Sequence, residues 1–169
     1  SIVSYSARVT ISERPVSRET VIFTIDNKPY TSITDSNGVA VINLDYGVGS
    51  YDVLVQCDEF NATSNLAVKS TIDAKDATGE YSNSKVSAKF LDTSGNALVS
   101  GNVIFKIGSS SYLRTTDSNG VATADINLNA GNYTVTAINN INKEQVQFGL
   151  SISKITPEMS FEVAQSNES

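Results

Sequence analysis

Apolar and polar residues alternate with a period of two along most of the chain. In KVSAKFLD, Val86, Ala88 and Phe90 fall on one side, whereas Ser87 and Lys89 fall on the other. A period of two is typical of a β-strand, whose successive side chains point to opposite faces of a sheet. Four later segments show the same alternation and predict these inward side chains: Val103, Phe105, Ile107, Ala122, Ala124, Ile126, Leu128, Tyr133, Val135, Ala137, Val146, Phe148, Leu150 and Ile152.

The faces opposite these apolar positions carry Thr, Asp, Asn, Gln and Ser. Strands with one polar face are typical of antiparallel sheets. Seven short strands separated by turn residues predict a Greek-key β-sandwich of the immunoglobulin-like type. In the C-terminal half we expect them at residues 70–76, 85–92, 102–107, 111–116, 121–128, 132–138 and 145–153.

The pattern occurs twice. The heptapeptide TDSNGVA stands at residues 34–40 and again at 116–122, and Val21 matches Val103 at the same offset of 82 residues. The agreement falls on apolar, Gly and turn positions, so the repeat duplicates a structural unit and not an active site. We therefore expect an all-β chain of two tandem immunoglobulin-like Greek-key β-sandwiches arranged end to end.

The repeat offset divides the chain into a first domain at residues 1–69 and a second at 70–153, with the start of a following repeat or a tail at 154–169. The first domain is shorter at its front, and we expect its first strand to be missing or abbreviated, as in a segment excised from a longer polypeptide. No Gly/Ser linker separates the domains, which predicts a monomeric rod with end-to-end contacts.

The repeated Asp-Ser-Asn-Gly suits a type I turn that closes a bulged hairpin. Gly38 and Gly120 would supply the positive φ, while Asp35 and Asp117 would accept bonds from the turn's own amides. An EF-hand-like calcium loop is an alternative, but the later carboxylates and the closing Glu are missing. Tyr51 and Tyr133 each follow a Gly-x pair early in the sixth strand, where a tyrosine corner is expected.

Composition argues against several classes of function. Lys and Arg number 12 against 18 Asp and Glu, giving a net charge of −6 without basic clusters, so neither nucleic acid nor direct membrane insertion is expected. The chain contains no His, which removes Ser-His-Asp and Cys-His nucleophiles and the commonest zinc ligand. Phosphate-binding glycine motifs are also missing. We expect a protein that is not an enzyme, with no catalytic residues, cofactor or metal site; composition leaves glycosidase-like carboxylate pairs open.

Two kinds of residue are candidates for covalent chemistry. Asn61, Asn132 and Asn167 head N-x-[ST] sequons and are candidate N-glycosylation sites. Cys57 has no cysteine partner, and its counterpart in the second repeat is Asn139. A small side chain near a strand end is the simpler interpretation of Cys57, and a reactive thiol is the alternative.

The stretch TDSNGVATADINLNAGNYTVTA resembles the repeated immunoglobulin-like domains of large adhesin-like surface proteins, most closely those of methanogenic archaea, in the style of invasin and intimin repeats. The Asp92–Asn96 turn departs from that pattern, because Ala97 stands where such repeats usually have Pro. The resemblance rests on turn and core residues, so it specifies architecture rather than a ligand.

The resemblance implies a non-catalytic segment of an extracellular, cell-surface glycoprotein that acts as a stalk or spacer and contributes to cell adhesion. Its partners would be a surface protein or glycan of another cell, or neighbouring repeats of the same chain. The alternative is a carbohydrate-binding β-sandwich module of a secreted enzyme, with Tyr30 or Tyr112 as sugar contacts.

Overall fold

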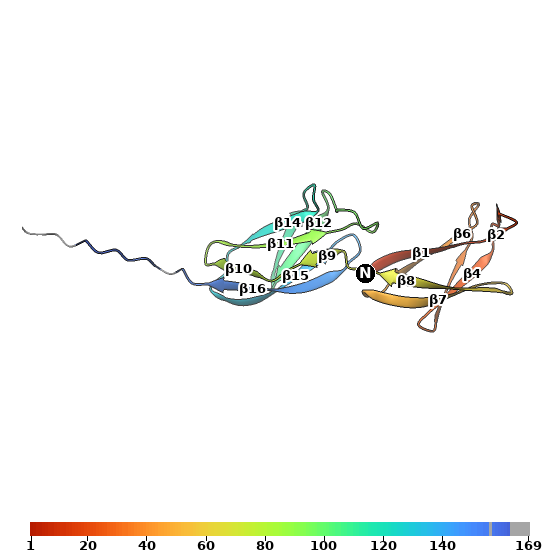
Figure 1. Ribbon diagram of the computed structural model, residues 1–169, viewed down its shortest axis with the longest axis horizontal. Coiled ribbons are helices and arrows are strands. Elements are labelled where there is room, and N and C mark those ends of the chain that lie inside the picture. The colour runs from red at the N-terminus through yellow and green to blue at the C-terminus, as the bar shows by residue number, and fades with distance from the viewer. Residues whose placement is uncertain (156, 163–169) are drawn as a thin grey trace, which may run out of the picture.

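The computed structural model describes residues 1–155 and 157–162. All regular secondary structure in these residues is β, and the strands form two groups that lie one after the other along the long axis (Figure 1). Each group encloses its own hydrophobic core. The prediction of an all-β fold built from immunoglobulin-like sandwiches is confirmed.

The first unit comprises β1 to β8. A four-stranded sheet in the order β5-β4-β7-β8 faces a two-stranded sheet of β1 and β6, and β2 pairs with β3 in a short hairpin. The bounds are β1 Ile2–Arg8, β2 Thr10–Ile11, β3 Arg14–Pro15, β4 Thr20–Ile25, β5 Lys28–Ile33, β6 Val39–Asp45, β7 Gly49–Cys57 and β8 Phe60–Val68.

The second unit comprises β9 to β16. Its larger sheet has the order β10-β16-β15-β12-β13, and its smaller sheet has the order β14-β11-β9. The bounds are β9 Ile72–Ala74, β10 Ala77–Glu80, β11 Ser84–Phe90, β12 Asn102–Ile107, β13 Ser110–Thr115, β14 Val121–Ile126, β15 Gly131–Asn139 and β16 Gln145–Ser153.

The alternating apolar residues make the core of the second unit, as predicted. Phe105 is fully buried at its centre and meets Phe90 and Phe148 edge to face, with ring centroids 6.1 and 6.5 Å apart. Leu128, Tyr133 and Val146 are half-buried at its margin.

Of the strand predicted at residues 70–76, only β9 at Ile72–Ala74 is observed, and an additional strand, β10 at Ala77–Glu80, follows it on the other sheet. β9 pairs antiparallel with β11, and β10 pairs parallel with β16. The polar pair Lys75-Asp76 stands between them, and the Asp76 carboxylate accepts a hydrogen bond from the Gly149 amide at 2.7 Å. That bond helps to turn the chain from one sheet to the other.

The repeated Asp-Ser-Asn-Gly turns have the expected internal bonding. Asp35 Oδ1 accepts the amides of Asn37 and Val39 at 2.8 and 3.0 Å, and Asp117 makes the equivalent bonds at the same distances. The hairpin assignment was wrong, because β5 and β6 belong to different sheets, as do β13 and β14. The turns carry the chain between sheets because the following strand pairs with β1 or β11 instead.

Glycine is required in these turns for two reasons. Gly38 and Gly120 have φ of 74° and 78°, in the left-handed region. A Cβ on Gly120 would also lie 2.5 Å from the Phe90 carbonyl oxygen, and Phe90 N donates to the Gly120 carbonyl at 2.8 Å. The glycine therefore fixes the turn against the end of β11.

We predict that Gly120→Ala lowers the free energy of unfolding of the second unit by about 2 to 4 kcal/mol, since left-handed strain adds to the close contact. Gly95→Ala is the matched control, because Gly95 has φ 86° but open space around its Cβ position. It should cost only about 1 kcal/mol. Urea unfolding of both variants checks this, and equal losses would contradict a role for the Phe90 contact.

Candidate functional site

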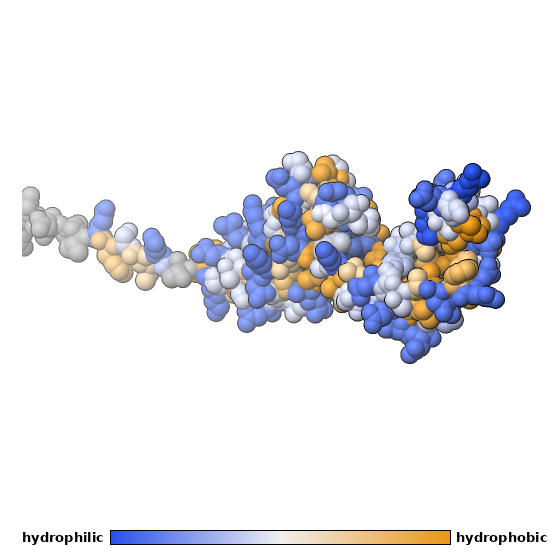
Figure 2. All heavy atoms as spheres, turned by 45° about the vertical axis from the view of Figure 1, so that its right-hand side comes forward, coloured by the Kyte–Doolittle hydropathy of each residue, from blue (hydrophilic) through white to orange (hydrophobic). Residues whose placement is uncertain are grey.

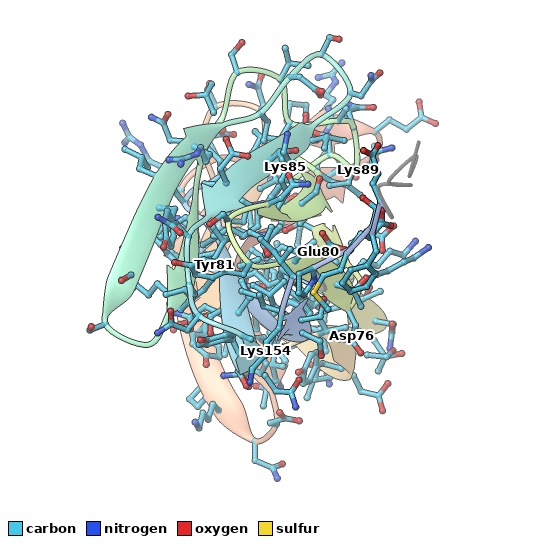
Figure 3. All side chains as sticks on the ribbon, turned by 90° about the vertical axis from the view of Figure 1, so that its left-hand side faces the viewer. Asp76, Glu80, Tyr81, Lys85, Lys89 and Lys154 are labelled. Atoms are coloured by element: carbon cyan, nitrogen blue, oxygen red, sulfur yellow. The ribbon has the colours of Figure 1, made fainter. Side chains whose placement is uncertain are left out.

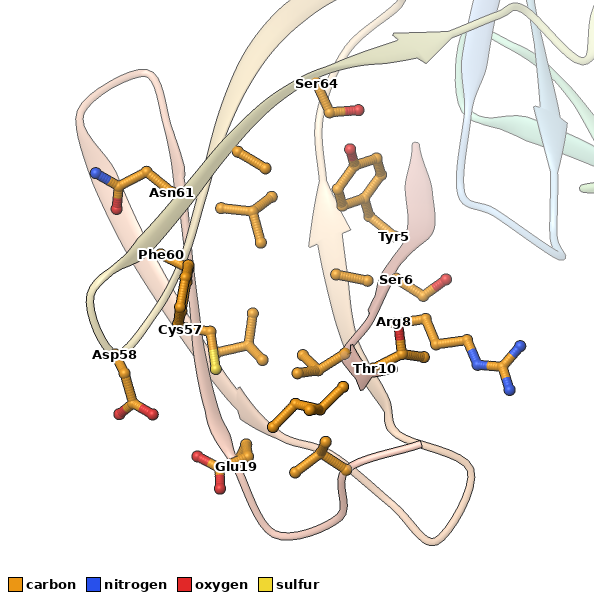
Figure 4. Close-up of a pocket in the computed structure, with 17 residues that line it drawn as sticks. Tyr5, Ser6, Arg8, Thr10, Glu19, Cys57, Asp58, Phe60, Asn61 and Ser64 are labelled. Carbon is orange, nitrogen blue, oxygen red and sulfur yellow. The ribbon is translucent and has the colours of Figure 1, made fainter. Parts of the chain in front are cut away.

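A largely apolar groove lies between the two sheets of the first unit, within the residues that the structure describes. It has a volume of about 650 Å³ and lies between β1 on one side and β7 and β8 on the other, with residues 9–16 at its end (Figure 4). Its lining is mostly apolar, and Ile11 and Phe60 are 68% and 80% exposed there. Figure 2 shows apolar side chains at the hollowed surface of this unit.

The second unit shows what this groove lacks. There β9 covers the equivalent place, pairing Ile72 with Phe90 and Ala74 with Ala88, and Ile72 is buried. β1 corresponds to β11, since Ala7 pairs with Ala40 as Ala88 pairs with Ala122. Among the described residues β1 pairs only with β6, so its other edge is open along the groove.

Smaller side chains open the groove further. The pairing of β8 with β7 places Ser64 where β16 has Phe148, and Ala62 where it has Val146. Tyr5 fills part of the space, with its ring edge to face on Phe23 at 5.9 Å between centroids. Tyr5 is therefore half-buried.

Glu19, Cys57 and Asp58 gather in the groove lining, with their candidate ligand atoms within 4.8 Å of one another. Burial raises the pKa of the Cys57 thiol, and the neighbouring carboxylates of Asp58 and Glu19 raise it further. A raised pKa lowers the thiolate fraction at neutral pH, and the thiolate is the nucleophilic form. The arrangement favours the structural interpretation of Cys57 over a reactive thiol.

The predicted corner tyrosines both bond back to the loop before their strand. Tyr51 donates to the Gly47 carbonyl at 2.9 Å, and Tyr133 donates to the Asn129 carbonyl at 2.7 Å. Tyr46 packs edge to face on Tyr51. A hydrogen bond with the Tyr30 hydroxyl, together with burial, raises the pKa of Tyr46 to about 12.

The candidate glycosylation sites differ in position. Asn61 lies in β8, and its side chain accepts a hydrogen bond from Gln56 Nε2 at 3.3 Å. Asn132 lies in β15 and accepts from Ser151 at 2.8 Å. Both are exposed. Asn167 lies outside the described residues.

The first residue of the repeated heptapeptide has a role that sequence reasoning missed. The Thr34 hydroxyl donates to the Val16 carbonyl at 2.7 Å and accepts the Glu19 amide at 2.9 Å. Thr116 joins the Leu98 carbonyl and the Gly101 amide in the same way. Both threonines are 3% exposed. Each anchors the loop that precedes β4 or β12, which explains why the repeat begins with Thr.

A polar cluster where the two units meet was also missed. We call it the junction cluster; it consists of the buried Asn139, Asn142 and Glu144, the half-buried Thr71 and the exposed Ser70. Glu144 accepts three bonds, from the Ser70 hydroxyl at 2.5 Å, the Thr71 amide at 2.7 Å and the Thr71 hydroxyl at 2.6 Å. The available signal was a two-residue insertion that shifts the repeat offset from 82 to 84 between β15 and β16.

Asn139 shows how the two units diverge at equivalent positions. Its fully buried amide donates to the Thr71 hydroxyl and to the Leu91 carbonyl, both at 3.0 Å. The first unit has Cys57 at this position, in the open groove. The second unit thus uses this position to hold the start of β9, whereas no strand of the described residues occupies the same place in the first unit.

No family model matches the chain, and no curated protein matches it. Solved structures do, including a 1.5-MDa bacterial ice-binding adhesin, at 19% identity and a TM-score of 0.33 over 94% of this chain and 59% of that one. Another is Yersinia pseudotuberculosis InvD, at 18% identity and a TM-score of 0.37, covering 96% of this chain and 55% of that one.

A third similar structure is the Bacteroides ovatus glucan-utilisation protein SGBP-B in complex with a mixed-linkage heptasaccharide. It is 14% identical with a TM-score of 0.33, over 89% of this chain and 42% of that one. Likeness at this level says nothing of what the present chain binds. Within the described residues, no helix has the length and apolar character needed to cross a membrane.

We predict that Tyr133→Phe destabilises the second unit by about 0.5 to 1.5 kcal/mol, the usual net contribution of one hydrogen bond. Tyr81→Phe is the control, since Tyr81 is 43% exposed. Chemical denaturation measures both. Equal stability of the two variants would mean that the Asn129 bond contributes nothing.

We also predict that iodoacetamide alkylates Cys57 more slowly than it alkylates an unstructured cysteine peptide at pH 8, because the raised pKa lowers the thiolate fraction. The difference should narrow as the pH rises. The rate can be followed by intact mass. Alkylation at the peptide's rate would contradict the raised pKa.

Proposed function

We propose that this chain is a non-catalytic segment of an extracellular adhesin-like protein, in which its repeats act as a stalk or spacer and contribute to cell adhesion. The junction carries the proposal: two sandwiches follow one another with no flexible linker, and partly buried hydrogen bonds hold the connection. A spacer must keep its two ends far apart and must not fold back on itself. A short junction held by hydrogen bonds restricts bending between the units.

The contacts at the junction come from both units. β8 ends at Val68, and Ser70 and Thr71 are already bonded to Glu144 of the second unit. From the other direction, the Ile2 amide donates to the Asn142 carbonyl at 2.7 Å. The connection and the start of β1 are therefore both attached to the loop between β15 and β16. Figure 1 shows the units end to end around this point.

The proposal also covers the domain boundaries, the location, the glycosylation sites and the partners of the segment. The domain boundaries are 1–69 and 70–153, and the segment is non-enzymatic, a monomeric rod and located at the cell surface. The archaeal affinity rests on the sequence resemblance alone. Asn61 and Asn132 are the glycosylation sites best supported by exposure. Partners are a surface protein or glycan of another cell, or neighbouring repeats.

Glu144→Ala tests the junction. It leaves the Ser70 and Thr71 donors without their acceptor, so the second unit should lose about 2 to 4 kcal/mol of stability. Under conditions where it remains folded, the angle between the units should become more variable. Exposed Glu80→Ala is the control. Small-angle X-ray scattering and inter-unit fluorescence transfer measure the angle, and an unchanged distribution would contradict the rigid junction.

The adhesive role needs a direct binding test. Fluorescently labelled folded chain is added to a panel of microbial cells and purified cell-wall glycans, beside the unfolded chain as a control. Saturable binding by the folded chain alone would assign recognition to this segment, and no binding would restrict it to spacing. Glycan binding that disappears in Tyr30→Ala or Tyr112→Ala would instead support the carbohydrate-binding alternative.

A further inference from the structure

The dipeptide Asn-Gly occurs twice in the chain, at Asn37-Gly38 and at Asn119-Gly120, once in each repeated turn. In such a pair the main chain can attack the Asn side chain, because glycine has no side chain to shield the nitrogen that follows Asn. Both Asn side chains are exposed, and it is the main-chain amide of each that bonds to the preceding Asp. The reactive amide of each pair is therefore open to water.

The reaction of an Asn-Gly pair consumes water and releases ammonia. The Gly nitrogen forms a bond to Cγ of Asn, the bond from Cγ to Nδ2 breaks, and the amide nitrogen leaves as ammonia with the proton that the Gly nitrogen gives up. Water then opens the five-membered ring at one of its two carbonyls. The product is either Asp or isoaspartate, in which the main chain is one carbon longer, and the mass rises by about 1 Da.

The folded turn directs the Gly nitrogen away from this reaction. To attack, the nitrogen has to release its own hydrogen bond and turn toward Cγ of the preceding Asn. In the second turn, Gly120 N donates to the Asp117 carbonyl at 3.1 Å, and Val121 N donates to Asp117 Oδ1 at 3.0 Å. The first turn has the equivalent two bonds, both at 3.0 Å. The peptide groups on both sides of the glycine are thus held in place.

The carbonyl of the same glycine is held by a neighbouring segment. Gly120 O accepts the Phe90 amide at 2.8 Å, and the first turn has the same bond at 2.7 Å from the Val9 amide. Phe90 belongs to β11, which pairs with β14 on one edge and β9 on the other. The apolar side chains of β11 are buried, while its Lys85 and Lys89 extend into solvent (Figure 3). The second turn therefore cannot rotate without breaking a bond to a core strand.

A third turn shows that this geometry does not need Asn. Asp92 Oδ1 accepts the amides of Ser94 and Asn96, both at 2.9 Å, and Gly95 N donates to the Asp92 carbonyl at 3.1 Å. These are the bonds of the repeated turns, with Ser94 in the place of Asn119. The reactive side chain can therefore be removed from a repeated turn while its hydrogen bonds are kept.

We propose that Asn37 and Asn119 are latent deamidation sites, which the folded turns keep closed and which open when their own unit unfolds. Isoaspartate lengthens the main chain of the turn and places a second carboxylate near Asp35 or Asp117, so the bonds of the turn do not re-form in full. Unfolding of a unit then becomes irreversible through a chemical change. Because each unit carries one site, each unit records its own unfolding.

Peptide mass spectrometry of the full chain, incubated at about pH 8 either folded or unfolded in urea, measures the rate at each Asn. In urea we expect Asn37 and Asn119 to deamidate faster than Asn96, which precedes Ala97. In the folded chain both should react about a hundredfold more slowly, since three bonds have to break and each lowers the open population about fivefold. Equal rates in the folded and unfolded chains would overturn the proposal.

Asp117→Ala tests whether the turn itself gives the protection. It removes the carboxylate that accepts the Asn119 and Val121 amides and leaves the Asn-Gly pair intact. Deamidation of Asn119 in the folded variant should become about tenfold faster or more, whereas Asn37 in the same chain should be unchanged. Urea unfolding establishes the conditions in which the second unit of the variant stays folded. An unchanged rate at Asn119 under those conditions would contradict protection by the turn.

Asn119→Ser, patterned on Ser94, tests irreversibility. The variant and the unaltered chain are held unfolded, returned to buffer, and compared by hydrogen exchange with mass spectrometry, which reports each unit separately. The second unit of the variant should recover fully, whereas in the unaltered chain it should recover only in molecules that keep Asn119. The first unit, with Asn37 in both proteins, should show the same loss in both. Equal recovery of the second unit in the two proteins would overturn the proposal.

Discussion

The chain passes from one sandwich to the next through Ser70 and Thr71, and the buried carboxylate of Glu144 holds both residues. A carboxylate removed from water needs hydrogen bonds, and three donors from this two-residue segment supply them. These bonds fix where β9 starts, and β9 in turn covers Phe90 in the core. The same loop accepts the Ile2 amide, so the attachment of the first unit depends on it as well.

The period-two pattern was sufficient to predict the sandwich fold and the inward residues from Val86 to Ile152. It succeeded because side-chain burial follows the pleat of a strand wherever one face meets the core. The internal hydrogen bonds of the two Asp-Ser-Asn-Gly turns were predicted correctly. Their role was not, because each turn joins strands of different sheets and not the two strands of a hairpin. Asx-capped turns depend on a few neighbouring residues, whereas the choice of hairpin or crossover depends on which distant strand offers an edge.

The sequence predicted that the first unit lacks its first strand, but it predicted neither the groove left in that place nor the junction cluster. Alternation of apolar residues predicts which face of a strand is buried, but it does not identify the neighbouring strand that pairs with each edge. The sequence of β1 therefore looks like that of a strand paired on both edges. The junction cluster joins residues more than 60 positions apart, for example Thr71 and Glu144. Only the mismatch between Cys57 and Asn139 and the two-residue insertion distinguish these regions in the repeat.

The parallel pairing of β10 with β16 has a mechanical consequence. β10 belongs to the segment by which the chain enters the second unit, and β16 is the strand by which it leaves. A force that pulls the two ends of this unit apart acts in opposite directions on these parallel neighbours. The hydrogen bonds between Ala77–Glu80 and Leu150–Ser153 would then bear the force together in shear, and they would not break one after another by peeling. The unit therefore resists tension along the long axis of the chain.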